Sequence, residues 1–190
     1  MRLLYAGGLC LWLAGVGFGL TQLWAYENAP GVAAVAPKTW PDASRVPHLD
    51  TRSTLIVLLH PQCSCSHATV AELARLHARV GDALHTYVFV YSPAGAPREW
   101  VRSSLWREAS AIPGVTVIAD PDGREARRFG AATSGQALLY DRGGHLRFNG
   151  GITGSRGHEG DNAGRSAIEQ LVREERAEHS STFVFGCSLL

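Results

Sequence analysis

The first 26 residues form one long apolar segment. No charged residue occurs from Leu3 to Tyr26, and most positions hold Leu, Trp, Val, Phe, Ala or Gly. A helix of this length spans a hydrocarbon core of about 30 Å. Arg2 precedes the segment and Glu27 follows it, so the positive-inside rule places the N-terminus in the cytoplasm. The pattern predicts a membrane anchor over residues 1–26, with the rest of the chain exported.

A cleaved secretory signal is the alternative to an anchor, because it has the same basic start and apolar stretch. Its one cleavage candidate, Ala34-Val35-Ala36, lies well beyond the apolar run, which favours the uncleaved anchor. Either way residues 27–190 are exported, and disulfides persist in exported compartments. Residues 27–50 are rich in Pro and Ala and follow no helical or strand period. We expect them to form a linker between the membrane and the domain.

From residue 51 onward, short apolar runs alternate with amphipathic stretches. The order of elements is strand, helix, strand, then strand and helix, then two strands and a helix. Such alternation predicts an α/β domain over residues 51–190, a three-layer mixed sheet with helices on both faces. The predicted strands cover 53–60, 85–91, 115–119, 136–140 and 145–149, and the predicted helices cover about 66–80, a stretch around 100–106, 124–129 and about 163–178.

Composition narrows the range of functions. Eighteen Lys and Arg stand against 17 Asp and Glu, for a formal net charge of +1, and no basic stripe is visible. The protein therefore has little excess positive charge with which to neutralise a phosphate backbone, and we expect no nucleic-acid binding. Residues 150–162 are rich in glycine but lack the Lys-Ser or Lys-Thr of a phosphate loop. We expect them to form a surface loop.

Two thiols lie where the first predicted strand gives way to a helix. The string from His60 to His67 reads His-Pro-Gln-Cys-Ser-Cys-Ser-His and contains Cys63 and Cys65. The first turn of a helix stabilises a thiolate, so Cys63 is expected to be reactive. This requires that its sulfur be open to solvent. A purely structural bridge between residues two apart would be strained and would constrain little of the unfolded chain, so redox or metal chemistry is favoured.

A third exported thiol, Cys187, lies in an apolar tail after the last predicted helix. With three thiols outside the membrane, one is left over whenever two pair. Cys187 is either a resolving thiol or ligand of the same site, or an isolated buried cysteine. The sequence leaves both possibilities open.

The same residues also allow a metal site. His60, Cys63, Cys65 and His67 lie within eight positions, and thiolate and imidazole ligands suit Cu(I) or Zn²⁺. Cys187 could add a further sulfur. A copper-binding or other soft-metal accessory protein is therefore the alternative function.

The order of motifs resembles the thioredoxin superfamily, most closely its membrane-tethered, exported thiol oxidoreductases. The resemblance rests on the strand leading into the Cys pair and on strings that share the family's order: Val-Thr-Val-Ile-Ala-Asp-Pro-Asp-Gly, Glu-Ala-Arg-Arg-Phe-Gly and Ala-Leu-Leu-Tyr-Asp-Arg-Gly-Gly. His-Pro-x-Cys-x-Cys, Thr-Ser-Gly, Gly-Gly-Ile-Thr-Gly and the terminal Phe-Gly-Cys also resemble a bacterial group labelled RedB-like.

The resemblance implies a role for each aligned residue. In a Cys-x-x-Cys motif the first Cys is the nucleophile, which matches Cys63, whereas Ser66 occupies the resolving position and Cys65 comes one residue early. This departure implies a monothiol enzyme, a strained Cys63–Cys65 couple, or resolution by another thiol. The family's cis-proline aligns with Gly135, directly after Ser134, and both positions would contact substrate.

Together these features predict a thiol–disulfide oxidoreductase of the bacterial inner membrane, single-pass, with its C-terminal domain in the periplasm. Cys63 and Cys65 are the expected catalytic residues, and Cys187, Ser66, Ser134 and Gly135 are the expected resolving or substrate-contact residues. The expected partners are protein thiols or disulfides, or a redox partner in the membrane. No cofactor is expected, unless the copper alternative holds.

Overall fold

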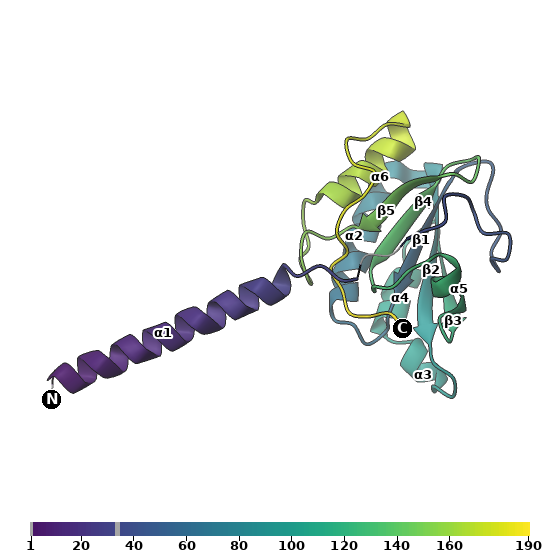
Figure 1. Ribbon diagram of the computed structural model, residues 1–190. Coiled ribbons are helices and arrows are strands. Elements are labelled where there is room, and N and C mark those ends of the chain that lie inside the picture. The colour runs from purple at the N-terminus through teal and green to yellow at the C-terminus, as the bar shows by residue number, and fades with distance from the viewer. Residues whose placement is uncertain (1, 33–34) are drawn as a thin grey trace.

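Helix α1 (Arg2–Glu27) projects away from the folded domain (Figure 1). The computed structural model describes residues 2–32 and 35–190. Within Leu4–Glu27, an 18-residue window has a mean hydropathy of 1.5, and none of that window is buried inside the structure. It is long and apolar enough to cross a membrane, as a signal or anchor segment must be. Ala34 of the candidate cleavage motif lies outside the described residues.

A five-stranded mixed sheet forms the centre of the domain (Figure 1). The strand order is β3-β2-β1-β4-β5. The first three strands in sequence run parallel, and β4 and β5 are antiparallel to their neighbours. The predicted mixed α/β sheet is thus confirmed. The strands are β1 (Ser53–Leu59), β2 (Leu84–Ser92), β3 (Val115–Pro121), β4 (Gln136–Tyr140) and β5 (Leu146–Gly151).

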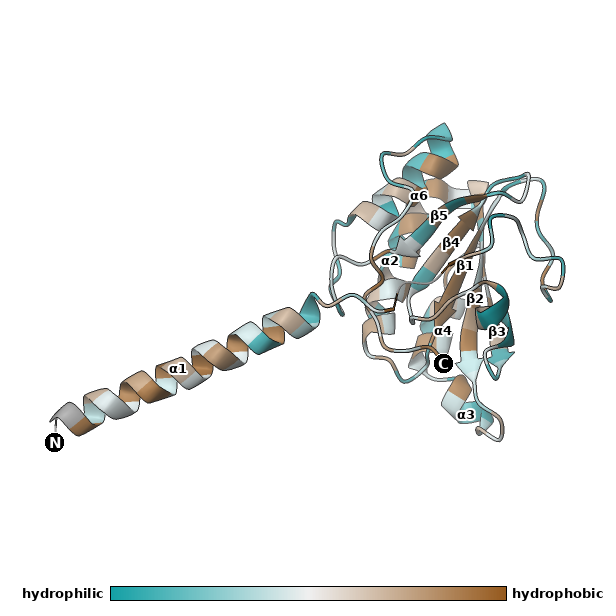
Figure 2. Ribbon diagram, in the orientation of Figure 1, coloured by the Kyte–Doolittle hydropathy of each residue, from teal (hydrophilic) through white to brown (hydrophobic). Residues whose placement is uncertain are grey.

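The central strand β1 is apolar at consecutive positions because both of its faces are buried. Leu55, Val57 and Leu59 face one hydrophobic cluster, and Ile56 and Leu58 face the other. Alternate side chains of a strand point to opposite sides, so a strand between two layers needs apolar residues throughout. The strands nearest the centre are accordingly the brown ones in Figure 2.

Helices cover both faces of the sheet. Helices α2 and α6 pack with α4 on one face of the sheet, while α5 and Phe129 pack on the other face. The predicted helix around residues 100–106 is two short helices, and the last helix ends four residues earlier than expected, at a left-handed Glu175 with φ 57°. The helices are α2 (Cys65–Val80), α3 (Arg98–Val101), α4 (Ser104–Ser110), α5 (Arg124–Arg128) and α6 (Ala163–Glu174), with a 3₁₀ turn at Gly81–Ala83.

Residues 35–50 pack against the domain, which differs from the expected free linker. Trp40 lies edge-on against Phe129 and Tyr140, with ring centroids 5.3 and 5.2 Å away. Leu146 donates its N–H to the carbonyl of Lys38. The sequence predicts a linker here because the apolar residues of the segment follow no period. In the structure these residues cover the second face of the sheet. The folded unit therefore begins before residue 51.

The C-terminal tail, residues 179–190, returns along the edge of the sheet (yellow in Figure 1). Ser181 forms a parallel bridge with Asn149 of β5, and Ser188 forms an antiparallel bridge with Thr133, just before β4. The tail thus runs from the outer strand to the end of the sheet where β1 meets α2.

Candidate thiol site

The turn between β1 and α2 places Cys63 at the start of the helix. Its N–H donates to the carbonyl of His60 at 3.1 Å, and its carbonyl accepts from the N–H of Ser66 at 3.0 Å. The helix begins at Cys65, and the backbone N–H of Cys65 donates to the Cys63 sulfur. A free N–H of the first helical turn thus points at this thiol, as the sequence predicted.

Cys187 meets Cys63 from the tail. The two Sγ atoms are 3.1 Å apart, within hydrogen-bonding distance, although 124 positions separate the residues. Both cysteines are free, so they form a contacting dithiol. Of the two possibilities left open for Cys187, the geometry matches a member of the site, whereas an isolated buried cysteine does not fit its exposed position.

The two sulfurs ionise very differently. Burial opposes ionisation of Cys63, but hydrogen bonds from the Cys187 thiol and backbone, the Ser66 hydroxyl and the Cys65 backbone outweigh it, and the pKa of Cys63 is lowered. The pKa of Cys187 is raised to about 11, first by its hydrogen bond to Cys63 and then by burial. Of the two thiols, Cys63 therefore loses its proton first, and Cys187 keeps its proton to higher pH.

Cys65 belongs to the same cluster but behaves as a neutral thiol. Burial raises its pKa, and the charge of Cys63 and a hydrogen bond to that sulfur raise it further. Of the three thiols of the site, Cys63 therefore ionises most readily.

Two predicted serines connect the elements around the thiols. The hydroxyls of Ser66 and Ser134 lie 2.9 Å apart, and the Ser134 hydroxyl also accepts from the N–H of His60 at 2.8 Å. The N–H of Ser134 donates to the carbonyl of Cys187 at 2.9 Å. Ser134 thereby joins the end of β1, the first turn of α2 and the tail.

Gly135 occupies the position that aligns with the family's cis-proline. It has a φ of +94°, and its N–H donates to the carbonyl of Leu58 at 2.8 Å. A proline could neither adopt this φ nor donate this bond. The substitution therefore changes how the segment before β4 is attached, although the segment still faces the thiols.

The two histidines of the motif do not join the thiols. His60 stacks on Tyr91, with ring centroids 5.5 Å apart, and burial lowers its pKa. His67 Nδ1 lies 2.8 Å from Glu108 on the surface. No three His, Cys, Asp or Glu residues in the described parts of the chain are placed to hold a metal ion. The side chains thus do not assemble the ligand set of the copper alternative.

The expected solvent access to Cys63 is not observed. The residue is only 3% exposed, because Cys187 and the tail lie over it. The prediction of an open nucleophile is wrong for this closed arrangement, since residues far downstream in the sequence form the cover.

Arg156 is a residue of the site that sequence reasoning missed. It donates to the carbonyl of Gly186, next to Cys187, and its positive charge lowers the pKa of both Cys65 and Cys187. It also lies over the ring of Tyr26 at the end of α1, 4.9 Å from the centroid. Its only signal in the sequence was a lone cation within the glycine-rich stretch, which we interpreted as a surface loop.

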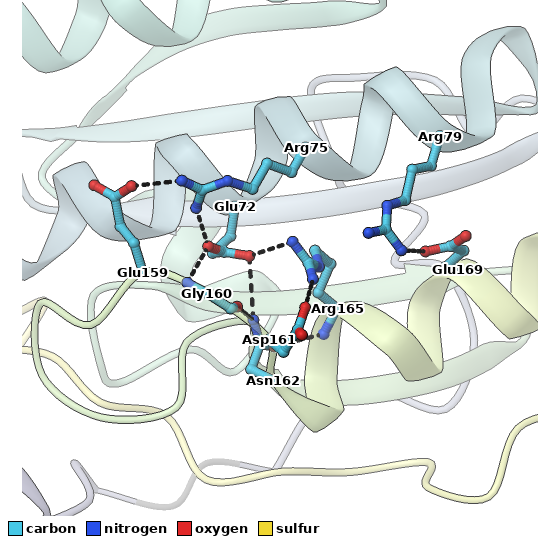
Figure 3. Close-up of polar contacts among 9 residues, drawn as sticks. All are labelled: Glu72, Arg75, Arg79, Glu159, Gly160, Asp161, Asn162, Arg165 and Glu169. Carbon is cyan, nitrogen blue, oxygen red and sulfur yellow. Dashed lines mark hydrogen bonds and ion pairs between the residues drawn. The ribbon is translucent and has the colours of Figure 1, made fainter.

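A buried ion pair fixes the loop that presents Arg156 (Figure 3). Glu72 of α2 is fully buried and lies 2.9 Å from Arg165 of α6. The same carboxylate accepts from the backbone N–H of Gly160 and from the side chain of Asn162. The charge is therefore paired and hydrogen-bonded, as a buried carboxylate must be, and it holds residues 160–162 against α2.

The comparisons with known proteins bear on the fold. No protein-family model matches the sequence, and the search of curated proteins found no match. The chain is similar to a hypothetical protein of Sinorhizobium meliloti 1021, with a TM-score of 0.59 and 18% identity over 85% of this chain and 93% of the other. It is similar to an uncharacterized conserved protein of Geobacillus kaustophilus, with a TM-score of 0.59 and 18% identity over 86% and 90%.

A more distant likeness is to a secreted disulfide oxidoreductase of Mycobacterium tuberculosis, with a TM-score of 0.44 and 12% identity over 66% of this chain and 82% of the other. The strand order, the cysteine-bearing turn after β1 and the helices on both faces establish a thioredoxin-like fold, as the resemblance predicted.

Proposed function

We propose that this chain is a membrane-anchored thiol–disulfide oxidoreductase in which Cys63 is the nucleophile and Cys187 the resolving thiol. The observation that carries the proposal is the 3.1 Å contact between the two Sγ atoms. A thiolate is the reactive form of cysteine, and the lowered pKa of Cys63 favours ionisation of the sulfur at the helix start. A second thiol lies within reach of the same sulfur.

The exchange proceeds in two displacements. The Cys63 thiolate attacks one sulfur of a partner disulfide, a Cys63–partner bond forms, and the other partner sulfur leaves as a thiolate that takes a proton from solvent. Cys187 then loses its proton and attacks the Cys63 sulfur, which releases the second partner thiol. Two electrons pass to the partner, and a Cys63–Cys187 disulfide remains. The reverse sequence oxidises a partner dithiol.

The electrostatics favour this order of events. The hydrogen bond to the Cys63 thiolate is the largest cause of the raised Cys187 pKa. Once Cys63 is bonded to the partner, its negative charge is gone, so this cause disappears. Cys187 therefore ionises more readily at the step in which it must attack, and the nearby positive charge of Arg156 lowers its pKa further.

Cys187 is a better resolving thiol than Cys65. Cys65 is fixed in the first turn of α2, two residues from Cys63, and a bridge across that spacing is strained. Cys187 lies in a tail without regular secondary structure around it, so its sulfur can move closer at little cost. Of the three outcomes that the Cys-x-Cys spacing implied, the geometry favours resolution by another thiol.

The proposal includes a location and a class of partner. α1 anchors the chain in the bacterial inner membrane, and the domain works in the periplasm on protein thiols or disulfides, or on a redox partner in the membrane. Membership of the RedB-like group is part of the same proposal. The two displacements use only the sulfurs of this chain and of the partner, and require no cofactor.

Activity measurements on the full chain in detergent test the proposal. Cys63→Ser is expected to abolish reduction of a disulfide substrate. Cys187→Ser is expected to accumulate the mixed disulfide with the partner, visible as a mass increase, whereas Cys65→Ser keeps most of the activity. Full activity of Cys63→Ser would refute the assignment.

A further inference from the structure

The nucleophile is covered by the chain's own tail. Cys63 is 3% exposed, and Cys187 occupies the space from which a partner sulfur would have to approach. Attack on a partner disulfide therefore requires that the tail move aside and that a partner segment take its place, and the second displacement requires that the tail then bring Cys187 back to the Cys63 sulfur. The surface under the tail consequently shows what that partner must look like.

The tail pairs with this surface through one isolated antiparallel bridge. The N–H of Ser134 donates to the carbonyl of Cys187, and the N–H of Leu189 donates to the carbonyl of Ala132, both at 2.9 Å. Thr133 and Ser188 form the antiparallel bridge between them. Residues 187–189 are thus extended and paired with residues 132–134.

The three tail residues at this bridge have different surroundings. Cys187 points to Cys63, Ser188 is exposed, and Leu189 is 2% exposed within the hydrophobic cluster that includes Phe129. The surface therefore accepts one sulfur and, two residues later, one large apolar side chain.

We propose that residues 132–134, with the Leu189 site beside them, select extended polypeptide segments of the pattern Cys-x-large apolar. The chain's own Cys187-Ser188-Leu189 is the resident copy of this pattern and competes with the partner. The inference rests on the proposed function, because the partner sulfur has to meet the Cys63 thiolate. It adds the side chain that distinguishes one polypeptide segment from another.

Backbone hydrogen bonding favours a polypeptide over a small thiol. When the tail leaves, the Ser134 N–H and the Ala132 carbonyl lose their partners, and unpaired backbone groups are costly away from water. An extended peptide offers one acceptor and one donor at the same spacing, which is the strand-addition mode of peptide recognition. A small thiol fills the sulfur position only.

The attachment of the tail depends on Gly186. A Cβ at this position would lie 1.9 Å from the carbonyl oxygen of Ser134, so any larger residue lifts the tail from the surface. Gly154 provides a control, because a Cβ there would meet only the flexible side chain of His158, at 3.4 Å.

A set of peptides tests the selection without altering the surface itself. The parent peptide has the sequence of residues 183–190, preceded by two lysines for solubility, and its cysteine carries a disulfide-linked nitrothiobenzoate. The Cys63 thiolate attacks the peptide sulfur, a Cys63–peptide disulfide forms, and the coloured aryl thiolate leaves with the electron pair. The reaction uses the full chain in detergent with Cys187→Ser, so that the adduct persists and mass spectrometry can locate it.

Changing the peptide leucine two residues after the cysteine to aspartate is expected to slow the reaction at least about tenfold, because a charge cannot enter the Leu189 site. Changing the intervening serine to aspartate is expected to leave the rate within about twofold, since that side chain faces solvent. Equal rates for the parent and the leucine variant would overturn the selection. A Cys63 that does not react even with a small aromatic disulfide would instead overturn the proposed function.

The resident tail is tested separately. Rates are compared at a pH at which Cys63 is ionised in every variant, because lifting the tail also removes the Cys187 donor. There Gly186→Ala is expected to accelerate the reaction of Cys63 with the parent peptide at least about tenfold, because it removes the competitor, whereas Gly154→Ala leaves the rate unchanged. An unchanged rate in Gly186→Ala, with the parent peptide still preferred, would show that the tail does not compete for the surface.

Discussion

The proton between Cys63 and Cys187 determines the chemistry of the site. Cys63 has its pKa lowered by hydrogen bonds from the tail and the helix start in spite of its burial, and Cys187 holds the proton. Neither property belongs to one residue alone, because each sulfur sets the charge of the other. In the proposed exchange, the thiol that lowers the pKa of Cys63 is therefore the one that later displaces the partner.

A pair of substitutions at Cys187 separates its hydrogen bond from its sulfur. Cys187→Ala removes the thiol donor to Cys63, so the pKa of Cys63 is expected to rise and its alkylation by iodoacetamide to require higher pH. Cys187→Ser retains a donor and is expected to leave the pH profile closer to that of the wild type. The measurement is the alkylation rate of Cys63 between about pH 5 and 10, the range around ordinary thiol pKa values. Identical profiles for the two variants would contradict the role of the donor.

The sequence could predict the residues at the centre of the site, because Cys63, Cys65 and Ser66 lie within four positions at a recognisable strand-to-helix change. It could also single out Ser134 and Gly135 through the resemblance. It could not predict the Cys63–Cys187 contact, since a distance across 124 positions depends on the path of the tail. Arg156 was missed for the same reason, because its role depends on where the glycine-rich loop is held.

At the scale of elements, that loop is held by contacts between α2 and α6. Glu72 and Arg165 are buried, and the backbone of Gly160 donates to the same carboxylate. Arg79 and Glu169 form a second pair between the same helices, at the surface. The two pairs allow a comparison of buried and exposed charge.

Removing the buried carboxylate is expected to destabilise the domain much more than removing the exposed cation. Glu72→Ala leaves the buried Arg165 with only the exposed carboxylate of Asp161 as an ion-pair partner, which costs up to about 3–5 kcal/mol, whereas Arg79→Ala costs less than about 1 kcal/mol. Denaturant unfolding of the full chain in detergent measures both. Similar losses for the two variants would mean that the Glu72 contacts do not hold the loop.

Apolar patterns could predict most elements, because a strand buried on both faces and an amphipathic helix each have a period or a length of their own. They failed for residues 35–50, where Trp40 and its neighbours pack on the sheet without regular structure. The same apolar patterns predicted one helix where the structure has α3 and α4, because the two short helices share one apolar stretch.

At the scale of the whole molecule, three distant parts of the chain converge on one end of the sheet. The last turn of α1 contacts Arg156 through Tyr26, Arg156 holds the tail at Gly186, and the tail covers Cys63. Length and composition could predict the apolar N-terminal helix and a folded unit after it. The contact between them depends on side chains that have no common pattern.

Acid is expected to destabilise the whole domain through His77. This residue is buried between α2 and β2, its Nε2 lies 2.8 Å from the Thr86 hydroxyl, and burial lowers its pKa to about 4. The unfolded chain binds a proton near pH 6.5, so stability is complete above that pH and is lost as the pH falls toward 4, by on the order of 2 kcal/mol. Unfolding free energies at pH 7.5 and 4.5 measure the loss. His77→Gln should reduce the pH dependence, and a matching reduction in the exposed control His158→Gln would contradict the assignment.

The pairing of cysteines after mild oxidation tests the central claim most directly. The full chain in detergent is oxidised, free thiols are alkylated, and the protein is digested without reduction and analysed by mass spectrometry. The account predicts a disulfide that links the peptide of Cys63 to the peptide of Cys187, with Cys65 alkylated. A Cys63–Cys65 disulfide with a free Cys187 would contradict it.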